Sequence, residues 1–206
     1  LDDYAFLIGA LLDFYQVSFE EEYLYKAQKI MDYVREHFFD KSSGMFFYTD
    51  DRFSNLIARK TEATDNVIPS SNSQMAKNLF ILGMYFEEET YSKEAQQMLQ
   101  NIKSDAVKNP GYYSHWAQVM SLLIHKPYEV AVVGKNWNQK RMELQKEFIP
   151  EAIFLGGEKA TLPLLENKFI VDQTMIYVCR NKTCALPVAE TEDALKQLKR
   201  GGKENP

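Results

Sequence analysis

Cysteine and histidine are scarce in this sequence, which has 206 residues, two cysteines and three histidines. Two cysteines cannot build a disulfide framework, and no further cysteine or nearby histidine completes a zinc site around them. No signal-peptide pattern stands at the start of the chain, but the chain opens at Leu1 inside a helical pattern, so targeting is not judged from this end. We therefore expect a reducing compartment and predict a cytoplasmic protein without a bound metal.

Long basic runs and long apolar runs are also missing. With a formal net charge of -5, the sequence lacks the electrostatic footprint of a nucleic-acid-binding protein. No apolar stretch approaches the roughly 20 residues that a helix needs to cross a bilayer. We therefore expect neither a nucleic acid nor a membrane as a partner.

Nucleotide-binding signatures are absent as well. Neither GxGxxG nor GxxxxGK[ST] occurs, although Gly134 follows the apolar segment EVAVV as a phosphate-binding turn would. A glycine that simply ends a strand is the plainer interpretation, and we predict no cofactor.

Apolar and aromatic residues are plentiful. Hydrophobic residues make up 45% of the chain and aromatic residues 13%, with 12 Tyr and 13 Phe. This content can build a sizeable core. The rings could floor a ligand cleft or serve helix packing with polar tips at the rim.

Helical periodicity dominates the first part of the chain, over residues 2–17, 20–38, 70–83, 92–107 and 112–124. Short links predict antiparallel hairpins, and their recurrence suggests a toroid or solenoid. Strands are predicted at 129–133, 152–155 and 175–179, with helices at 136–146 and 191–198. The predicted fold class is mostly α: a partial (α/α) toroid over 1–126, a small α/β extension over 127–198 and a disordered tail over 199–206.

The segment 59–73, RKTEATDNVIPSSNS, holds two cations, two carboxylates and a run of hydroxyl and amide groups before a helix. A helix start with free N–H groups can hold a carboxylate, a phosphate or a sugar oxygen. Glu62 and Asp65 are the predicted catalytic acid and base. The predicted substrate-binding residues here are Arg59, Lys60, Ser70, Asn72 and Ser73. Simple capping of the helix, with Pro69 fixing its entry, is the competing interpretation.

Two further groups are candidates for substrate binding. Asp2, Asp3 and Tyr4 begin the first helix, where one carboxylate could face a cleft or cap the helix. His115 and Trp116 begin the fifth helix, where histidine could shuttle protons and tryptophan could stack on a sugar ring. A packed histidine beside a core tryptophan is the alternative.

Cys179 and Cys184 stand at the ends of CRNKTC, which is not the redox CxxC spacing. Structural thiols, a disulfide across a turn, and metal or redox chemistry all remain open for this pair.

Five landmarks occur in order: LDDYA at 1–5, GMFFYT at 44–49, RKTEATDNVIPSSNS at 59–73, EVAVVG at 129–134 and YVCRNKTCALP at 177–187. Together they resemble the C-terminal part of the YyaL-like, thioredoxin-domain-containing proteins, also called the spermatogenesis-associated type. Ser71 departs from the pattern, since a small residue, often glycine, is expected there.

The resemblance implies that the chain is a piece of a longer protein with an upstream thioredoxin-like domain. It implies a barrel similar to the N-acylglucosamine 2-epimerase and six-hairpin glycosidase folds, and therefore a sugar-binding or carbohydrate-active role with a small carbohydrate partner. Whether the protein is an enzyme stays open. A non-catalytic protein-interaction module and a thiol redox role are the alternatives. A partial ring should also expose an apolar face, so we expect self-association through it.

Overall fold

The computed structural model describes residues 1–53, 57–159 and 161–201 and divides them into two compact units. The first unit contains Leu1–Asp13 and Glu22–Ile124. The second contains Phe14–Glu21 and the chain from His125 onward. The first helix thus contributes residues to both units.

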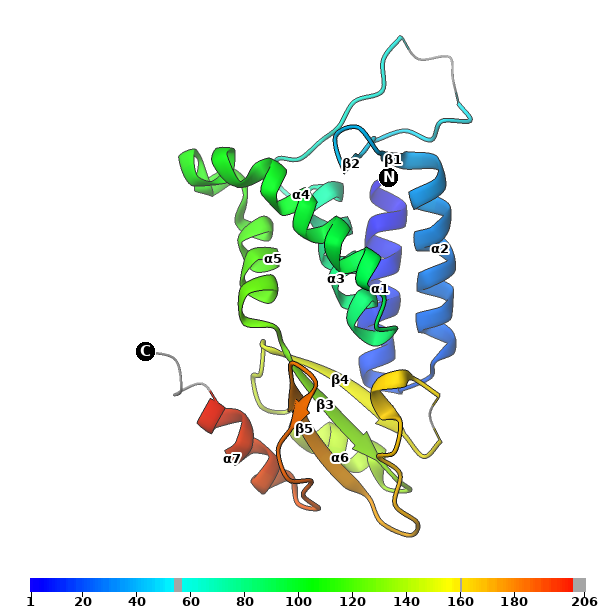
Figure 1. Cartoon of the computed structure of the whole chain (residues 1–206), viewed down its shortest axis with the longest axis vertical. Helices are drawn as coiled ribbons and strands as arrows, with labels where there is room; N and C mark the ends of the chain where they lie inside the picture. Colours follow the sequence, from blue (N-terminus) through cyan, green and yellow to red (C-terminus); the bar gives the residue numbers. More distant parts are fainter. Residues whose placement is uncertain (54–56, 160, 202–206) are drawn as a thin grey trace. The chain divides into compact units, whose positions relative to one another are not determined.

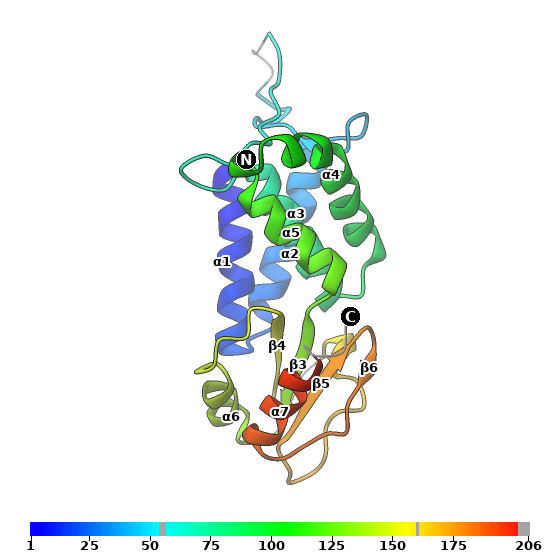
Figure 2. The same cartoon turned by 90° about the vertical axis from the view of Figure 1, so that its left-hand side faces the viewer.

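The first unit is built mainly of helices, and its bounds follow the predicted segments closely (Figures 1 and 2). Its helical elements are α1 (Asp2–Ser18), α2 (Glu22–Phe38), α3 (Ser71–Tyr85), α4 (Glu89–Lys108), the 3-10 turn η1 (Pro110–Tyr112) and α5 (Ser114–His125). The helix α2 buries a stripe at helical spacing, which includes Leu24, Ala27 and Met31. The apolar period therefore predicts this helix and the face that it buries.

The helix α3 lies at the centre of the first unit, since all its residues except Lys77 and Met84 are buried. Ser70 is its N-cap, and the Ser70 Oγ accepts a hydrogen bond from the Ser73 backbone N–H at 3.1 Å. This geometry fits the capping interpretation of the sequence. Such a helix has neighbours on every side, so its polar first turn also lies inside the protein.

A short two-stranded sheet precedes the long loop that leads into α3. The strands β1 (Phe39–Asp40) and β2 (Met45–Phe46) pair antiparallel across the turn that contains Gly44. From the sequence, the β-prone residues 45–48 are predicted to be one arm of a hairpin or an ordered loop, because two-residue strands are too short to show alternation.

The second unit contains a four-stranded mixed sheet with strand order β4-β3-β5-β6 (Figures 1 and 2). Its elements are β3 (Tyr128–Val133), α6 (Trp137–Leu144), β4 (Ala152–Gly157), the 3-10 turn η2 (Pro163–Leu165), β5 (Met175–Arg180), β6 (Thr183–Cys184) and α7 (Thr191–Gly201). The strands β3 and β4 are parallel and joined through α6, whereas β5 runs antiparallel to both β3 and β6. The predicted strand–helix–strand unit is confirmed.

Close packing requires glycine at two positions at the ends of the parallel strands. Gly134 has a φ of +127°, and a Cβ there would lie 2.7 Å from the Thr174 Cα. Gly156 has a φ of +151°, and a Cβ there would lie 2.8 Å from the Val132 carbonyl carbon. Neighbouring backbone therefore fills the space beside Gly134, which favours the plain strand-ending glycine over a phosphate-binding turn.

The predicted fold class, a mostly α partial toroid with a small α/β tail, is wrong for this chain. The described residues form seven α-helices, a two-stranded sheet and a four-stranded mixed sheet, so each unit contains a sheet as well as helices. Periodicity reports which face a segment buries. Ring closure depends on contacts between distant segments, and periodicity does not report those.

The predicted disordered tail began at Lys199, but residues 199–201 continue α7, and residues 202–206 lie outside the described ranges. Among the described residues, no helix combines the length and the apolar character needed to cross a bilayer. The cytoplasmic location stays a prediction.

Candidate functional site

Several predicted site residues lie around one tyrosine, Tyr48, which follows β2. The Tyr48 hydroxyl donates a hydrogen bond to the Asp2 carboxylate at 3.1 Å. The Tyr48 backbone N–H donates to the Lys60 carbonyl at 2.7 Å. The pKa of Tyr48 is raised, first by the hydrogen bond to Asp2 and further by the negative charges of Asp2, Glu62 and Asp3. We call Asp2, Asp3, Tyr48, Lys60 and Glu62 the Tyr48 cluster.

The Tyr48 cluster faces solvent. Tyr48 is 37% exposed, Asp3, Lys60 and Glu62 are exposed, and Asp2 is half-buried. Within the described ranges, the carboxylates of Asp3 and Glu62 make no hydrogen bond or ion pair with the protein. Tyr48 was not among the predicted site residues, although it belongs to the GMFFYT landmark.

Asp65, the other predicted proton carrier, is buried and bonded through both carboxylate oxygens. Its Oδ1 accepts from the Ser70 backbone N–H at 2.9 Å and from the Ser73 hydroxyl at 2.8 Å. Its Oδ2 accepts from the His115 backbone N–H at 2.8 Å. The carboxylate therefore fastens the loop to the starts of α3 and α5, and we assign it this structural role in place of acid–base chemistry.

Asn72 holds the other side of the same loop. Its Oδ1 accepts from the Phe46 backbone N–H at 2.8 Å, and its Nδ2 donates to the Phe46 and Glu62 carbonyls at 2.9 Å each. The Ser70 hydroxyl donates to the Ala63 carbonyl at 3.1 Å. The predicted substrate-binding groups of α3 are therefore used within the protein, and they fix the backbone on which Glu62 stands.

Arg59 and Trp116 are likewise committed to the fold. The Arg59 guanidinium lies 4.3 Å from the Phe47 ring centre, and its Nε donates to the Thr49 carbonyl at 3.0 Å. The Trp116 Nε1 donates to the Ala63 carbonyl at 2.7 Å, and the side chain is only 1% exposed. A ring buried this deeply cannot stack on a sugar, so the core interpretation of Trp116 fits the geometry.

His115 is buried at the start of α5, and its Nε2 has no hydrogen-bond partner among the described residues. Burial is the main cause that lowers the pKa of this histidine, and the positive charge of Lys77 lowers it further. The folded protein therefore favours the neutral imidazole.

A pH dependence of stability follows from this lowered pKa. The pKa of His115 in the folded protein lies below the unfolded value of about 6.5. The contribution of the neutral imidazole to stability is therefore fully present above that pH. It is lost as the pH falls through the folded pKa. Urea unfolding at a series of pH values should show wild type losing stability relative to His115→Gln below pH 6.5. A constant difference at every pH would contradict this.

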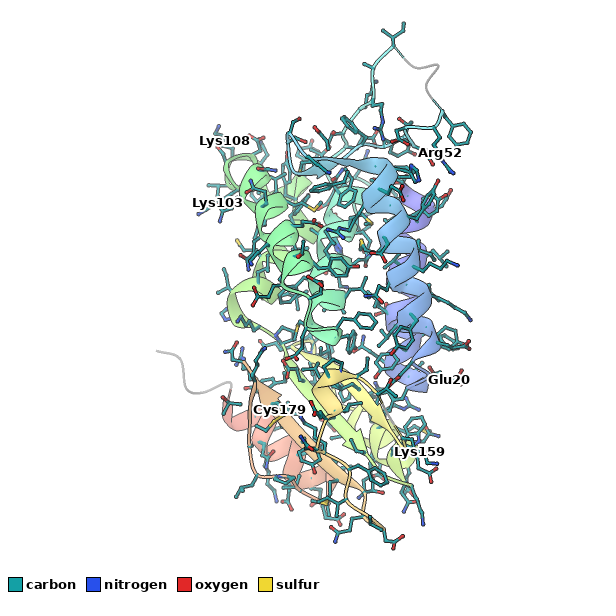
Figure 3. All side chains as sticks on the ribbon, turned by 45° about the vertical axis from the view of Figure 1, so that its right-hand side comes forward. Glu20, Arg52, Lys103, Lys108, Lys159 and Cys179 are labelled. Carbon is teal, nitrogen blue, oxygen red and sulfur yellow. A yellow bond between two sulfur atoms is a disulfide. The ribbon has the colours of Figure 1, made fainter. Side chains whose placement is uncertain are left out.

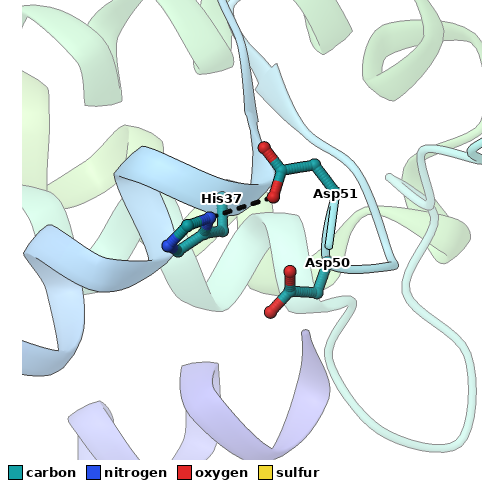
Figure 4. Close-up of side chains that lie close together, drawn as sticks. All are labelled: His37, Asp50 and Asp51. Carbon is teal, nitrogen blue, oxygen red and sulfur yellow. Dashed lines mark hydrogen bonds and ion pairs between the residues drawn. The ribbon is translucent and has the colours of Figure 1, made fainter. Parts of the chain in front are cut away.

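His37, Asp50 and Asp51 form a second polar group at the end of α2 (Figure 4). The His37 Nδ1 and the Asp51 Oδ1 are 2.9 Å apart, and the three side chains offer ligand atoms that all lie within 4.8 Å of one another. Such a group could hold a cation only if Asp50 were available to it.

Asp50 is already paired with a cation of the protein. The Arg52 Nε and Nη2 donate to its two oxygens at 3.1 and 3.0 Å, and the Tyr33 hydroxyl also bonds to it. These bonds, that of Arg52 above all, hold the pKa of Asp50 well below its usual range. Tyr4, which was predicted to bind substrate, packs on Tyr33 with ring centres 5.4 Å apart. We therefore assign a structural role to His37, Asp50 and Asp51.

Cys179 and Cys184 are joined by a disulfide in the second unit, with sulfurs 2.06 Å apart (Figure 3). Of the possibilities that the sequence leaves open, the structure therefore contains the bonded pair.

Exposed apolar side chains occur on the helices of the first unit. Leu7 on α1 is 48% exposed, and Met120 and Ile124 on α5 are 42% and 66% exposed. The self-association and the protein-interaction module expected from the sequence stay predictions.

No family model matches the sequence. Spermatogenesis-associated protein 20 of Homo sapiens is 24% identical to the chain, and the protein of the same name from Rattus norvegicus is 23% identical. Both matches cover 96% of this chain and 27% of the relative. An uncharacterized protein of Caenorhabditis elegans is 33% identical over 47% of this chain and 13% of its own length.

The chain thus spans about a quarter of the length of the mammalian relatives that it matches. The likenesses support the resemblance to the spermatogenesis-associated type of protein. A thioredoxin-like domain and a sugar-binding role stay predictions.

Proposed function

We propose that the Tyr48 cluster binds a small carbohydrate. Three carboxylates and a tyrosine hydroxyl can accept hydrogen bonds from sugar hydroxyls, and Lys60 can donate to a sugar oxygen. Charge-assisted hydrogen bonds of this kind are stronger than neutral ones. The observation that carries the proposal is the hydrogen bond of 3.1 Å from Tyr48 to Asp2, with the charges of Asp3 and of Glu62, from a distant segment, near enough to raise the pKa of Tyr48.

Preorganisation supports the proposal. Asp65 and Asn72 fasten the loop at its buried side, so the exposed groups of Lys60 and Glu62 stand on backbone that is already ordered. Ordering a loop upon binding costs free energy, and a loop that is held beforehand avoids that cost. Of the two predicted proton carriers, Glu62 is the one whose carboxylate still faces solvent.

The proposal is tested by titrating the protein with a panel of neutral mono- and disaccharides while recording amide chemical shifts. Shifts are expected at Tyr48, Lys60 and Glu62. The Asp3→Asn/Glu62→Gln double variant should bind about tenfold or more weakly, because hydrogen bonds to charged groups contribute roughly 1.5 kcal/mol or more each. Glu166→Gln, a change at an exposed glutamate of the second unit, serves as the matched control and should bind like wild type.

Two outcomes would remove the proposal. One is the absence of shifts at the Tyr48 cluster across the whole panel at millimolar concentrations. The other is binding that the double variant and the Glu166→Gln control weaken to the same extent.

A further inference from the structure

The disulfide of the second unit closes a hairpin at the outer edge of its sheet. Cys179 in β5 and Cys184 in β6 are register partners, and β6 is the edge strand in the order β4-β3-β5-β6. Asn181 and Lys182 form the turn with φ angles of 52° and 64°. Both residues adopt the left-handed conformation that suits a two-residue hairpin turn.

The fold does not depend on this covalent bond for the pairing of β5. The strand is already paired with β3 over five register positions, from Glu129↔Cys179 to Val133↔Met175. A disulfide that closes so short a loop also removes less entropy from the unfolded chain than one that closes a long loop. The pairing of β5 with β3 therefore does not require the bond.

What the bond does hold is the segment that continues from β6. The Ala185 N–H donates to the Val178 carbonyl at 2.9 Å. Ile176 and Val188 exchange two backbone hydrogen bonds of 2.8 and 3.0 Å. These few bonds and the disulfide attach residues 183–188 to the edge of β5. Opening the disulfide would loosen this segment.

The two sulfurs belong to residues of very different accessibility. Cys179 is 2% exposed, whereas Cys184 is an exposed residue. A nucleophile from solvent can therefore approach Cys184, and the buried Cys179 becomes the leaving group.

We propose that the Cys179–Cys184 pair is a site of thiol–disulfide exchange with an external dithiol. A thiolate of the dithiol attacks the Cys184 Sγ, the bond between the two protein sulfurs breaks, and Cys179 leaves as a thiolate that takes a proton from water. The second thiolate of the dithiol then attacks its own sulfur in the mixed disulfide and releases Cys184. The protein gains two electrons and two protons, and the dithiol leaves as a disulfide.

The first test follows the bond itself in the folded protein. Wild type is isolated without reductant and incubated with dithiothreitol in the absence of denaturant, then alkylated and mapped by mass spectrometry. Opening within minutes, and recovery of the bond after the dithiothreitol is removed and glutathione disulfide is added, are expected. Two free thiols in the protein as isolated, or a bond that dithiothreitol opens only in denaturant, would overturn the proposal.

The second test assigns the attacked sulfur. Cys179→Ser leaves only Cys184, which should react with a small aromatic disulfide at least tenfold faster than the lone Cys179 of the Cys184→Ser variant. Equal rates, or a faster reaction of Cys179, would contradict attack at Cys184. Differential alkylation of the reduced wild-type protein answers the same question if either variant fails to fold.

The third test measures the response of the edge segment. Reduction should speed hydrogen exchange at the Ala185 amide by about tenfold or more, because the edge segment can then open locally without the constraint of the disulfide. The Cys179→Ser/Cys184→Ser double variant, which cannot form the bond, should match the reduced protein. Unchanged exchange in both would show that the bond does not hold this segment.

Discussion

Replacing Asp65 with alanine is expected to lower the free energy of unfolding of the first unit by about 3 to 5 kcal/mol. The carboxylate accepts from the Ser70 and His115 amides and from the Ser73 hydroxyl, all inside the protein. Its removal leaves the two amide donors buried without a partner. The Ser73 hydroxyl still has a hydrogen-bond partner, because it can donate to the Ser70 carbonyl at 2.9 Å.

Urea unfolding followed by Trp116 fluorescence measures this loss. Trp137, the other tryptophan, is replaced by phenylalanine in all proteins compared, so that the signal comes from the first unit alone. Glu62→Gln is the matched control, since this exposed carboxylate should change stability by no more than about 0.5 kcal/mol. The free energy of unfolding of Asp65→Asn should lie between those of Asp65→Ala and Glu62→Gln. The amide oxygen of the new asparagine can keep one of the hydrogen bonds. If Asp65→Ala were as stable as the control, the structural role assigned to Asp65 would be wrong.

Replacing Gly156 with alanine should destabilise the second unit by about 4 kcal/mol or more, which is exceptional for one methyl group. The φ of +151° lies in a region that side chains other than glycine's rarely adopt. A Cβ would also collide with the Val132 carbonyl and lie 2.9 Å from the Phe19 ring. Because both Val132 and Phe19 are buried, neither can move aside cheaply.

Gly157 offers a control for the backbone strain alone. Its φ is +136°, but the nearest atom to a Cβ there is the Lys159 carbonyl oxygen at 3.6 Å. Gly157→Ala should therefore cost about 1 to 3 kcal/mol from strain without a collision. Trp137 fluorescence reports both variants, since its ring stacks on Phe19 with centres 4.9 Å apart. Equal losses at the two glycines would show that the close approach to Val132 does not matter.

The local elements of this protein could be predicted because their causes lie within a few residues. The buried stripe of α2 and the Ser70 cap of α3 each depend on neighbours three to four positions apart. The apolar run of β3 and the glycine after it mark a strand in the same way. The very short β1 and β2 carried too few residues for any period to show.

The candidate site could be predicted only in part. From the sequence, Asp2, Asp3, Lys60 and Glu62 were predicted as polar groups available to a ligand. The sequence does not predict that they lie around Tyr48. Tyr48 and Asp2 are separated by 46 positions, and no local pattern links them. Nor could it separate Glu62 from Asp65, since composition does not distinguish an exposed carboxylate from a buried one.

The sequence by itself determined where most helices and strands begin and end, because capping and hydrophobic period act over one or two turns. Only the tertiary structure decided what the polar residues do. Asp65 meets the His115 amide across 50 positions, and burial there turns a candidate catalytic acid into a structural acceptor. The tertiary structure also decided the order of the strands in the sheet and the formation of the Cys179–Cys184 bond. Both depend on which segments pack together, which is a property of the folded chain.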